Sequence, residues 1–396
     1  MKKKNKTAIF YAYSNNALDH LAPYVFLCHK KKIRCIVVYG EDFTSRKVFP
    51  NTKIVNIFQN IKIDIYNIPF SEKKGFIKTI FYFIWLWVGL IEYKKYFPNY
   101  LKLKLKGLCL RLYNRLDGNL IGRNIATNLL KDKSEFFVFT DNCNPKKFKN
   151  SFLTKIKKHA KIITTGHSVF QKKINTKKGL FVEDFALLMN YGEAHYKSYL
   201  KNKKITGSLR FSKNWIKILD LHSLNNKNFK NKKKNIIVLM SPPYLTKNWK
   251  HMLNTLAKLI SINDINVIIL PHVRGMYNLK PPIELKNNWY KNLTLDSAIK
   301  NSDIIISWGS TGIFEGVVRN KKILYLSFLD LDSNIKKYLW INKVSKNIII
   351  KNEYELFDAI NNYRTNKKID NDGFKKIIWP NNDPWIKASN ILDKII

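Results

Sequence analysis

The stretch at residues 303–328, DIIISWGSTGIFEGVVRNKKILYLSF, constrains the fold more than any other part of this chain. It opens with an apolar run short enough for a buried strand, followed by a turn bracketed by Gly309 and Gly312. Apolar residues then recur at helical spacing until Asn320, and a second apolar run follows at 323–328. Strand, tight turn, helix and strand form the unit that builds parallel sheets, so an α/β fold is predicted.

The turn in this stretch has two interpretations. Glycines let a ligand approach closely, and the hydroxyls of Ser310 and Thr311 beside a helix start could hold a phosphate. Glu315, one turn into the helix, could accept hydrogen bonds from sugar hydroxyls. In the other interpretation, Ser310 or Thr311 is an ordinary helix N-cap and Glu315 only a favourable acid near the helix start.

Length and charge narrow the class of protein. A chain of 396 residues with 45% apolar residues has enough material for two cores. The net charge of +43 indicates an anionic partner, yet only nine of the 71 basic residues are arginine. Because arginine is the residue favoured for base and forked phosphate recognition, we expect no nucleic acid and favour an anionic membrane surface.

The remaining pattern divides the chain into two α/β halves. Residues 1–221 form an expected N-terminal acceptor-side domain with an apolar and basic helical insert at about 71–131, and 222–234 read as a linker. A second, donor-side domain is expected at 235–380, with a C-terminal helix at 381–396. Expected elements include strands at 6–13, 33–39, 53–58, 135–141 and 161–165, and helices at 17–29, 249–260 and 353–361.

Polar residues follow several of the expected strands, where open α/β sheets bind ligands. In the first half these are Gly166, His167 and Ser168, with Arg210 after a later strand. In the second half they are His272, Arg274 and the turn described above. Their convergence predicts an interdomain cleft as the functional site.

Residues 135–330 carry a resemblance to known families. SWGSTGIFEGVVRNKKILYL resembles the donor-nucleotide half of GT-B glycosyltransferases of capsule and lipopolysaccharide synthesis. TTGHS followed by ITGSLRF is similar to CDP-glycerol glycerophosphotransferase-like surface-carbohydrate proteins. These families often show His-Pro after the second-domain strand, where this chain has Pro271-His272.

This resemblance implies two Rossmann-like domains and roles for the residues in the cleft. His272, Arg274 and Gly309 to Gly312 would hold the donor phosphates, and Glu315 the ribose. His167 would be the general base, with Gly166, Ser168 and Arg210 on the acceptor or phosphate side. The donor would be a nucleotide-sugar or CDP-glycerol and the acceptor a glycan or lipid-linked molecule, with no cofactor and no metal. Asp330-Leu331-Asp332 has metal-binding spacing, but we interpret it as coincidence.

Two alternatives remain. One is an enzyme resembling the UDP-N-acetylglucosamine 2-epimerases, which rely on several carboxylates around the cleft. The other is a non-catalytic protein that binds anionic membranes or nucleic acid. Binding of a nucleotide would distinguish the transferase and the epimerase from the non-catalytic binding protein.

Residues 79–91, TIFYFIWLWVGLI, form the most apolar segment. The thirteen residues carry no charge, fall short of the roughly 20 needed to span a bilayer, and have lysines on both sides. Such a segment suits an interfacial helix, although a core helix would look similar. With four scattered cysteines and no apparent signal peptide, we expect a cytoplasmic protein at the inner face of the plasma membrane.

Flotation with liposomes tests this membrane expectation. The protein should float with anionic vesicles at low salt and less at high salt, because lysine attraction is screened. The double change Trp85→Glu/Trp87→Glu should weaken flotation, provided that the variant folds. Binding that ignores both lipid charge and this double change would contradict the expectation.

Overall fold

The computed structural model describes residues 5–12, 15–40, 52–68, 120–131, 134–141, 152–166, 184–189, 202–222, 229, 233–241, 246–272, 281–291, 293–330, 349–363 and 371–396. The apolar run at 79–91, most of the expected linker, and His167, Ser168 and Arg274 lie outside these residues. No helix within the described ranges is long and apolar enough to cross a membrane.

The first domain is built on a seven-stranded sheet in the order β3-β2-β1-β4-β5-β6-β7, with every neighbouring pair parallel. The strands are β1 (Lys6–Ala12), β2 (Arg34–Gly40), β3 (Asp64–Ile68), β4 (Glu135–Thr140), β5 (Ala160–Thr165), β6 (Phe185–Leu188) and β7 (Lys203–Ile205). Alternate residues of these strands point to opposite faces, and both faces are apolar. A parallel sheet of this kind must be covered on both sides.

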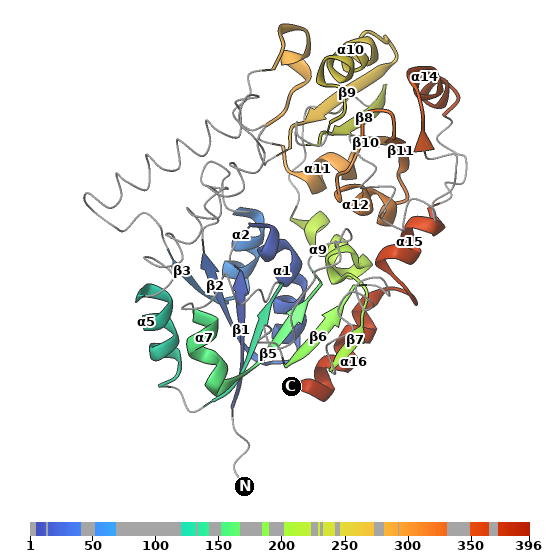
Figure 1. Ribbon diagram of the computed structural model, residues 1–396. Coiled ribbons are helices and arrows are strands. Elements are labelled where there is room, and N and C mark those ends of the chain that lie inside the picture. Colours follow the sequence, from blue (N-terminus) through green and yellow to red (C-terminus); the bar gives the residue numbers. More distant parts are fainter. Residues whose placement is uncertain are drawn as a thin grey trace, which may run out of the picture.

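Helices cover both faces of this sheet (Figure 1). One face packs on α1 (Asn15–Lys30), α2 (Thr52–Asn60), α9 (Lys213–Leu221) and α16 (Pro384–Ile395). The other packs on α5 (Leu120–Leu129) and α7 (Phe152–Ile156). Short 3-10 turns, η2 (Lys157–His159) and η3 (Leu209–Phe211), complete the domain.

The strand expected at residues 53–58 is wrong, because these residues lie in helix α2. Ile54, Ile57 and Phe58 are buried and share one helical face, whereas Asn56 is exposed. This i, i+3, i+4 spacing is typical of a helix. In a short apolar run, the helical period is difficult to distinguish from the pattern of a buried strand.

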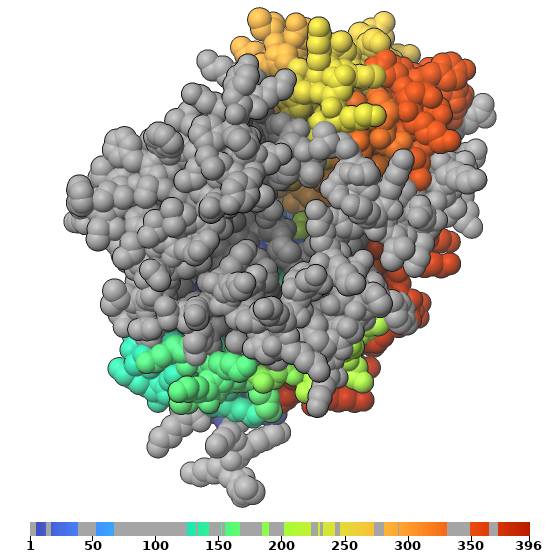
Figure 2. All heavy atoms as spheres, in the orientation of Figure 1, coloured from blue at the N-terminus to red at the C-terminus, as the bar shows by residue number. Residues whose placement is uncertain are grey.

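The second domain has a five-stranded parallel sheet in the order β12-β11-β10-β8-β9. Its strands are β8 (Lys234–Leu239), β9 (Ile265–Leu270), β10 (Ile304–Ser307), β11 (Lys322–Leu326) and β12 (Ile349–Ile350). Helices α10 (Trp249–Ile260) and α14 (Glu353–Asn361), with η5 (Ile283–Asn288), cover one face, and α11 (Leu295–Lys300), α12 (Ile313–Val318) and α15 (Asp372–Ile378) cover the other. Figure 2 shows one face of the molecule with the described surfaces of the two domains at opposite ends.

The C-terminal segment returns from the second domain to the first. Helix α15 packs in the second core, whereas Trp385, Ala388 and Leu392 of α16 lie in the core of the first (Figure 1). The crossing is tight at Gly207, whose φ of +91° lies in the left-handed region. A Cβ at Gly207 would lie 2.9 Å from the Cβ of Pro384.

Replacing Gly207 by alanine should therefore destabilise the protein. We expect a loss of about 1–3 kcal/mol in the free energy of unfolding, from backbone strain and the clash with the returning chain. Urea denaturation measures it, and Asn214→Ala, at an exposed position of α9, is the control. Equal stability of the two variants would contradict a tight crossing.

Candidate functional site

The carboxyl edges of the two sheets face each other across the domain junction. Asp19 of α1 and Lys53 of α2 lie in helices that follow β1 and β2, and both pair with second-domain or junction residues. Lys53 contacts Asp296 of α11, and Asp19 contacts Arg210. Open α/β sheets bind ligands at this edge, where the strand order reverses. The reversal lies between β1 and β4 in the first sheet and between β8 and β10 in the second.

The predicted turn lies at the second of these reversals. Its first residue, Gly309, has a φ of +89°, which glycine adopts without strain. The backbone N–H of Gly312 donates to the Ser310 hydroxyl oxygen at 3.3 Å, and neither Ser310 nor Thr311 caps α12. Ser310 and Thr311 are therefore not the N-cap, which is Gly312 without a side-chain bond, while Glu315 does lie in the first turn as the N-cap interpretation expected.

The backbone at the start of α12 also limits how this turn could bind an anion. The N–H groups of Ile313, Phe314 and Glu315 already donate to carbonyls of the turn. A phosphate at this turn would therefore rely on the half-buried hydroxyls of Ser310 and Thr311 more than on helix N–H groups.

Trp308, directly before the turn, is held by the neighbouring strand and loop. Its indole Nε1 donates to Thr246 Oγ1 at 2.9 Å, and the Ser241 hydroxyl donates to its carbonyl. Ser307 donates to the carbonyl of Leu239 at 3.0 Å, which ties β10 to β8 across the reversal. The indole is fully buried, so these bonds fix the backbone from which the turn projects.

Tyr325 supports the same turn from β11. Its hydroxyl donates to Asp330 Oδ2 at 2.5 Å. Burial raises the pKa of Tyr325, the Asp330 charge and hydrogen bond raise it further, and a hydrogen bond with the Gly309 backbone offsets part of this. Asp330 thus has a partner within the domain, and Asp332 lies outside the described residues. In the described ranges no group of three or more His, Cys, Asp or Glu side chains is arranged to hold a metal.

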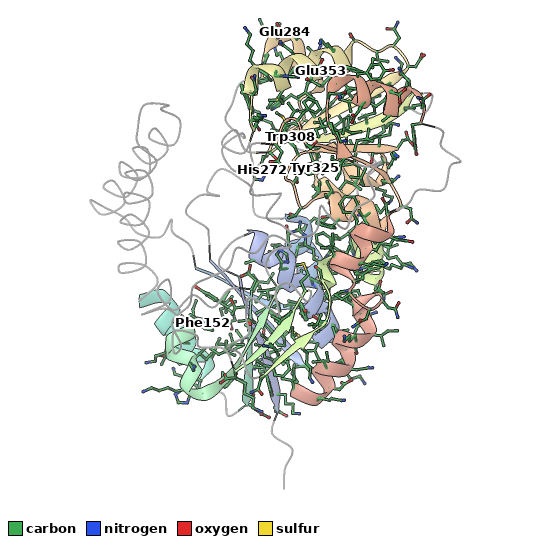
Figure 3. All side chains as sticks on the ribbon, turned by 45° about the vertical axis from the view of Figure 1, so that its right-hand side comes forward. Phe152, His272, Glu284, Trp308, Tyr325 and Glu353 are labelled. Atoms are coloured by element: carbon green, nitrogen blue, oxygen red, sulfur yellow. The ribbon has the colours of Figure 1, made fainter. Side chains whose placement is uncertain are left out.

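His272 lies two residues beyond the end of β9 and is half-buried. Its strand neighbours β8, which neighbours β10, so His272 is on the same edge as the turn. In Figure 3, His272, Trp308 and Tyr325 all lie on the side of the second domain that is nearer the first. The expected donor role of His272 stays a prediction.

Glu315 lies in a buried charged environment rather than on an open surface. Only 4% of the residue is exposed. Its Oε1 is 3.5 Å from Arg210 Nη2, and its Oε2 is 3.7 Å from Arg319 Nη1. The 3.7 Å distance is too long for a hydrogen bond, and Oε2 has no hydrogen-bond partner. A buried carboxylate oxygen without a donor is an acceptor that a ligand hydroxyl could satisfy.

Burial and charge act on Glu315 in opposite directions. Burial raises the pKa of Glu315, because a carboxylate is poorly solvated in the interior. The guanidiniums of Arg210 and Arg319 lower it, and the carboxylates of Asp296 and Asp19 raise it again. The charge of Glu315 therefore depends on the two arginines.

In the first domain, Gly166 directly follows β5, and Arg210 lies in η3 after β7. Arg210 Nη2 is 3.6 Å from Asp19 Oδ2, so its guanidinium lies between carboxylates of both domains. The structure thus brings Arg210 and Glu315 into direct contact, whereas the sequence placed both at the cleft without predicting this pair. The expected acceptor-side roles of Gly166 and Arg210 stay predictions.

Sequence reasoning missed several charged residues here, and three of them show which contacts a local pattern can signal. Arg319 could have been found from its i+4 spacing to Glu315, a separation that brings side chains together on a helix. Asp141 directly follows β4 at the strand reversal and is 2% exposed. Asp19 gives no local signal, because its partner Arg210 is distant in the chain.

Two doubly wound domains that face each other by their carboxyl edges, with a C-terminal helix returning to the first, define the GT-B architecture. This confirms the predicted fold class.

Solved structures of the same architecture match nearly the whole chain. A candidate UDP-N-acetylglucosamine 2-epimerase from Listeria monocytogenes matches with a TM-score of 0.57 and 12% identity, covering 98% of this chain and 95% of that one. The Rickettsia bellii UDP-N-acetylglucosamine 2-epimerase matches with a TM-score of 0.53 and 15% identity, covering 99% of this chain and 97% of that one. The kitacinnamycin glycosyltransferase matches with a TM-score of 0.54 and 8% identity, covering 99% of both chains.

At these identities the likeness establishes the fold alone. No protein-family model matches the chain, and no curated protein matches it. The fold is thus one that glycosyltransferases and epimerases share, and the choice between these activities depends on the site.

Proposed function

We propose that this protein is a transferase of bacterial surface-polysaccharide synthesis. It moves a sugar, or a glycerophosphate, from a nucleotide-activated donor to a glycan or lipid-linked acceptor. The donor lies on the second domain and the acceptor enters from the first. The activated donor is a substrate, so the reaction proposed here uses no separate organic cofactor.

The observation that carries the proposal is the buried carboxylate of Glu315. Glu315 lies in the first turn of α12, the helix that follows the Gly309–Gly312 turn at the strand reversal of the second sheet, and its Oε2 has no hydrogen-bond donor. The ribose of a nucleotide has two neighbouring hydroxyls, one of which could donate a hydrogen bond to Oε2. The phosphates of the same nucleotide would then lie near Ser310 and Thr311. The GT-B fold, shared with proteins named for nucleotide-sugar chemistry, supports this placement.

The transfer step needs a base on one side and charge stabilisation on the other. We assign the base to His167, with Gly166, Ser168 and Arg210 on the acceptor or phosphate side. Neutral imidazole near pH 7 can accept the proton of an acceptor hydroxyl. His272 and Arg274 would stabilise the negative charge of the leaving nucleotide together with the turn.

The finer parts of the proposal rest on the sequence. The TTGHS and ITGSLRF motifs favour a CDP-glycerol glycerophosphotransferase-like enzyme as one form of the transferase. The charge of +43 and the apolar run at 79–91 favour work at an anionic membrane surface, where a lipid-linked acceptor would be found.

A 2-epimerase is the second candidate, because the Listeria and Rickettsia structures bear that name. Inversion at C2 of the sugar breaks a C–H bond and needs acid and base groups beside it. Asp19, Asp296 and Glu315 lie between the domains, each paired with a cation, and Asp141 lies at the strand reversal of the first sheet, so carboxylates that an epimerase would need are present as well. Incubation of UDP-N-acetylglucosamine in D2O discriminates: deuterium at C2 indicates the epimerase.

Nucleotide binding should depend on Glu315. Glu315→Ala removes the acceptor for the ribose and should weaken donor binding by about 1–3 kcal/mol, whereas Glu315→Gln keeps an amide oxygen as a weaker, uncharged acceptor and should lose less. Calorimetry with UDP, CDP and GDP measures it on folded variants. Glu284→Ala is the control, because Glu284 is exposed at the far end of the second domain (Figure 3). Unchanged affinity in both Glu315 variants would remove Glu315 from the site.

Turnover should depend on His167. His167→Ala should lower the rate about 10²–10⁴-fold while leaving donor affinity nearly intact, because the other domain holds the donor. His167→Gln separates orientation from proton transfer, since an amide can hold a hydroxyl but cannot take its proton. His159→Ala, at an exposed position of the same domain, is the control. Turnover of a folded His167→Ala variant at the wild-type rate would place the base elsewhere.

A further inference from the structure

A chain of five charged side chains crosses the domain junction. It runs from Asp19 of α1 to Arg210 of η3, then to Glu315 and Arg319 of α12, and ends at Asp220 of α9. The successive nitrogen–oxygen distances are 3.6, 3.5, 3.7 and 2.7 Å. Three carboxylates thus surround two guanidiniums.

The side chains in the middle of this series of ion pairs are buried, and those at its two ends are more exposed to solvent. The side chains of Arg210, Glu315 and Arg319 are 11%, 6% and 7% exposed, against 24% for Asp19 and 29% for Asp220. A buried charge is costly unless a partner compensates it. Glu315, on the second domain, is compensated by Arg319 of its own helix and by Arg210, a guanidinium that the first domain supplies.

Arg210 is held where the returning chain crosses. The N–H of Ser208 donates to the carbonyl of Ile378 at 2.9 Å, and Trp379 Nε1 donates to the carbonyl of Phe211 at 3.0 Å. These bonds bracket Arg210 in η3 from both sides. Its position next to Glu315 is therefore set by how the C-terminal segment joins the domains.

We propose that Arg210 is a positioning residue that makes nucleotide binding by the second domain depend on the docked first domain. Its guanidinium lies 3.5 Å from Oε1 of Glu315, and Oε2, which is near Arg319 but has no hydrogen-bond partner, is the atom that would accept a ribose hydroxyl. When the domains separate, Glu315 loses that partner and the donor site is incomplete. The inference rests on the proposed role of Glu315 in donor binding and gives Arg210 a second role, which it exerts through Glu315.

Removing Arg210 should make donor binding pH-dependent. The charged groups that act on Glu315 are Arg210, Arg319, Asp296 and Asp19, and burial raises the pKa of Glu315 before any of them. Without Arg210, its pKa rises further, so a larger fraction of the carboxyl is neutral at a given pH. A neutral carboxyl accepts more weakly, so affinity should recover as the pH increases and Glu315 ionises.

The test is calorimetry on the full chain between pH 6 and 9, with whichever of UDP, CDP and GDP binds wild type best. Arg210→Met keeps an unbranched side chain and removes the charge. We expect about tenfold weaker binding at pH 7, with recovery at higher pH, whereas wild-type affinity changes little over this range. Arg34→Met, which breaks an exposed ion pair with Asp64, is the control and should bind like wild type.

A double-mutant cycle shows whether Arg210 acts through Glu315. In the Glu315→Gln background, Arg210→Met should have little further effect, and the pH dependence should disappear. If Arg210→Met does not fold, Arg210→Lys is the second variant. Lysine keeps the positive charge, but a single ammonium group cannot contact the carboxylates of Asp19 and Glu315 equally well. The lysine variant should bind about threefold more weakly, with a smaller pH dependence.

The outcomes separate this inference from the proposed function. Wild-type protein that binds none of the nucleotides overturns the proposed function and the inference with it. Wild-type binding together with an unchanged affinity and pH profile in the folded Arg210 variants overturns the inference alone. An equal loss with and without the Glu315 carboxylate also overturns it, since Arg210 would then act independently of Glu315.

Discussion

The junction of the two domains depends on charges that have been removed from water. Glu315 lies between Arg210 and Arg319, and Lys53 of the first domain contacts Asp296 of the second. Buried pairs contribute little net stability, because desolvation offsets the attraction, yet separating the partners leaves uncompensated charges. Such pairs therefore favour one relative placement of the domains more than they stabilise either domain. The apolar cores on each sheet supply the stability itself.

This placement decides which parts of each sheet can act together. Both domains present the edge where parallel strands end, and both strand orders reverse there. The reversal in the second sheet is bridged by Ser307 and Ser241, which hold the backbone of the Gly309 turn. In the first sheet, the reversal brings Asp141 to the same junction. A ligand between the domains would contact loops supported by rigid strands on both sides.

The GT-B fold by itself does not select a reaction. The same architecture is present in the matched epimerases and in a glycosyltransferase, so the chemistry follows from the side chains on the facing edges. Here the carboxylates of Asp19, Asp296 and Glu315 lie between the domains, and each is paired with a cation.

The sequence by itself determined the local elements and the fold class. Helices α10 and α14 begin and end where the periodicity predicted, because their apolar spacing and Asn caps are local signals. The strand–turn–helix–strand unit around Gly309 likewise depends on residues close in the chain. A strand was predicted where helix α2 lies, because the apolar run there is too short to distinguish the helical period from the strand period. Only the tertiary structure decided that Arg210 meets Glu315 and that α16 packs on the first domain. These contacts join residues far apart in sequence, and no local pattern encodes which distant charge will compensate a buried one.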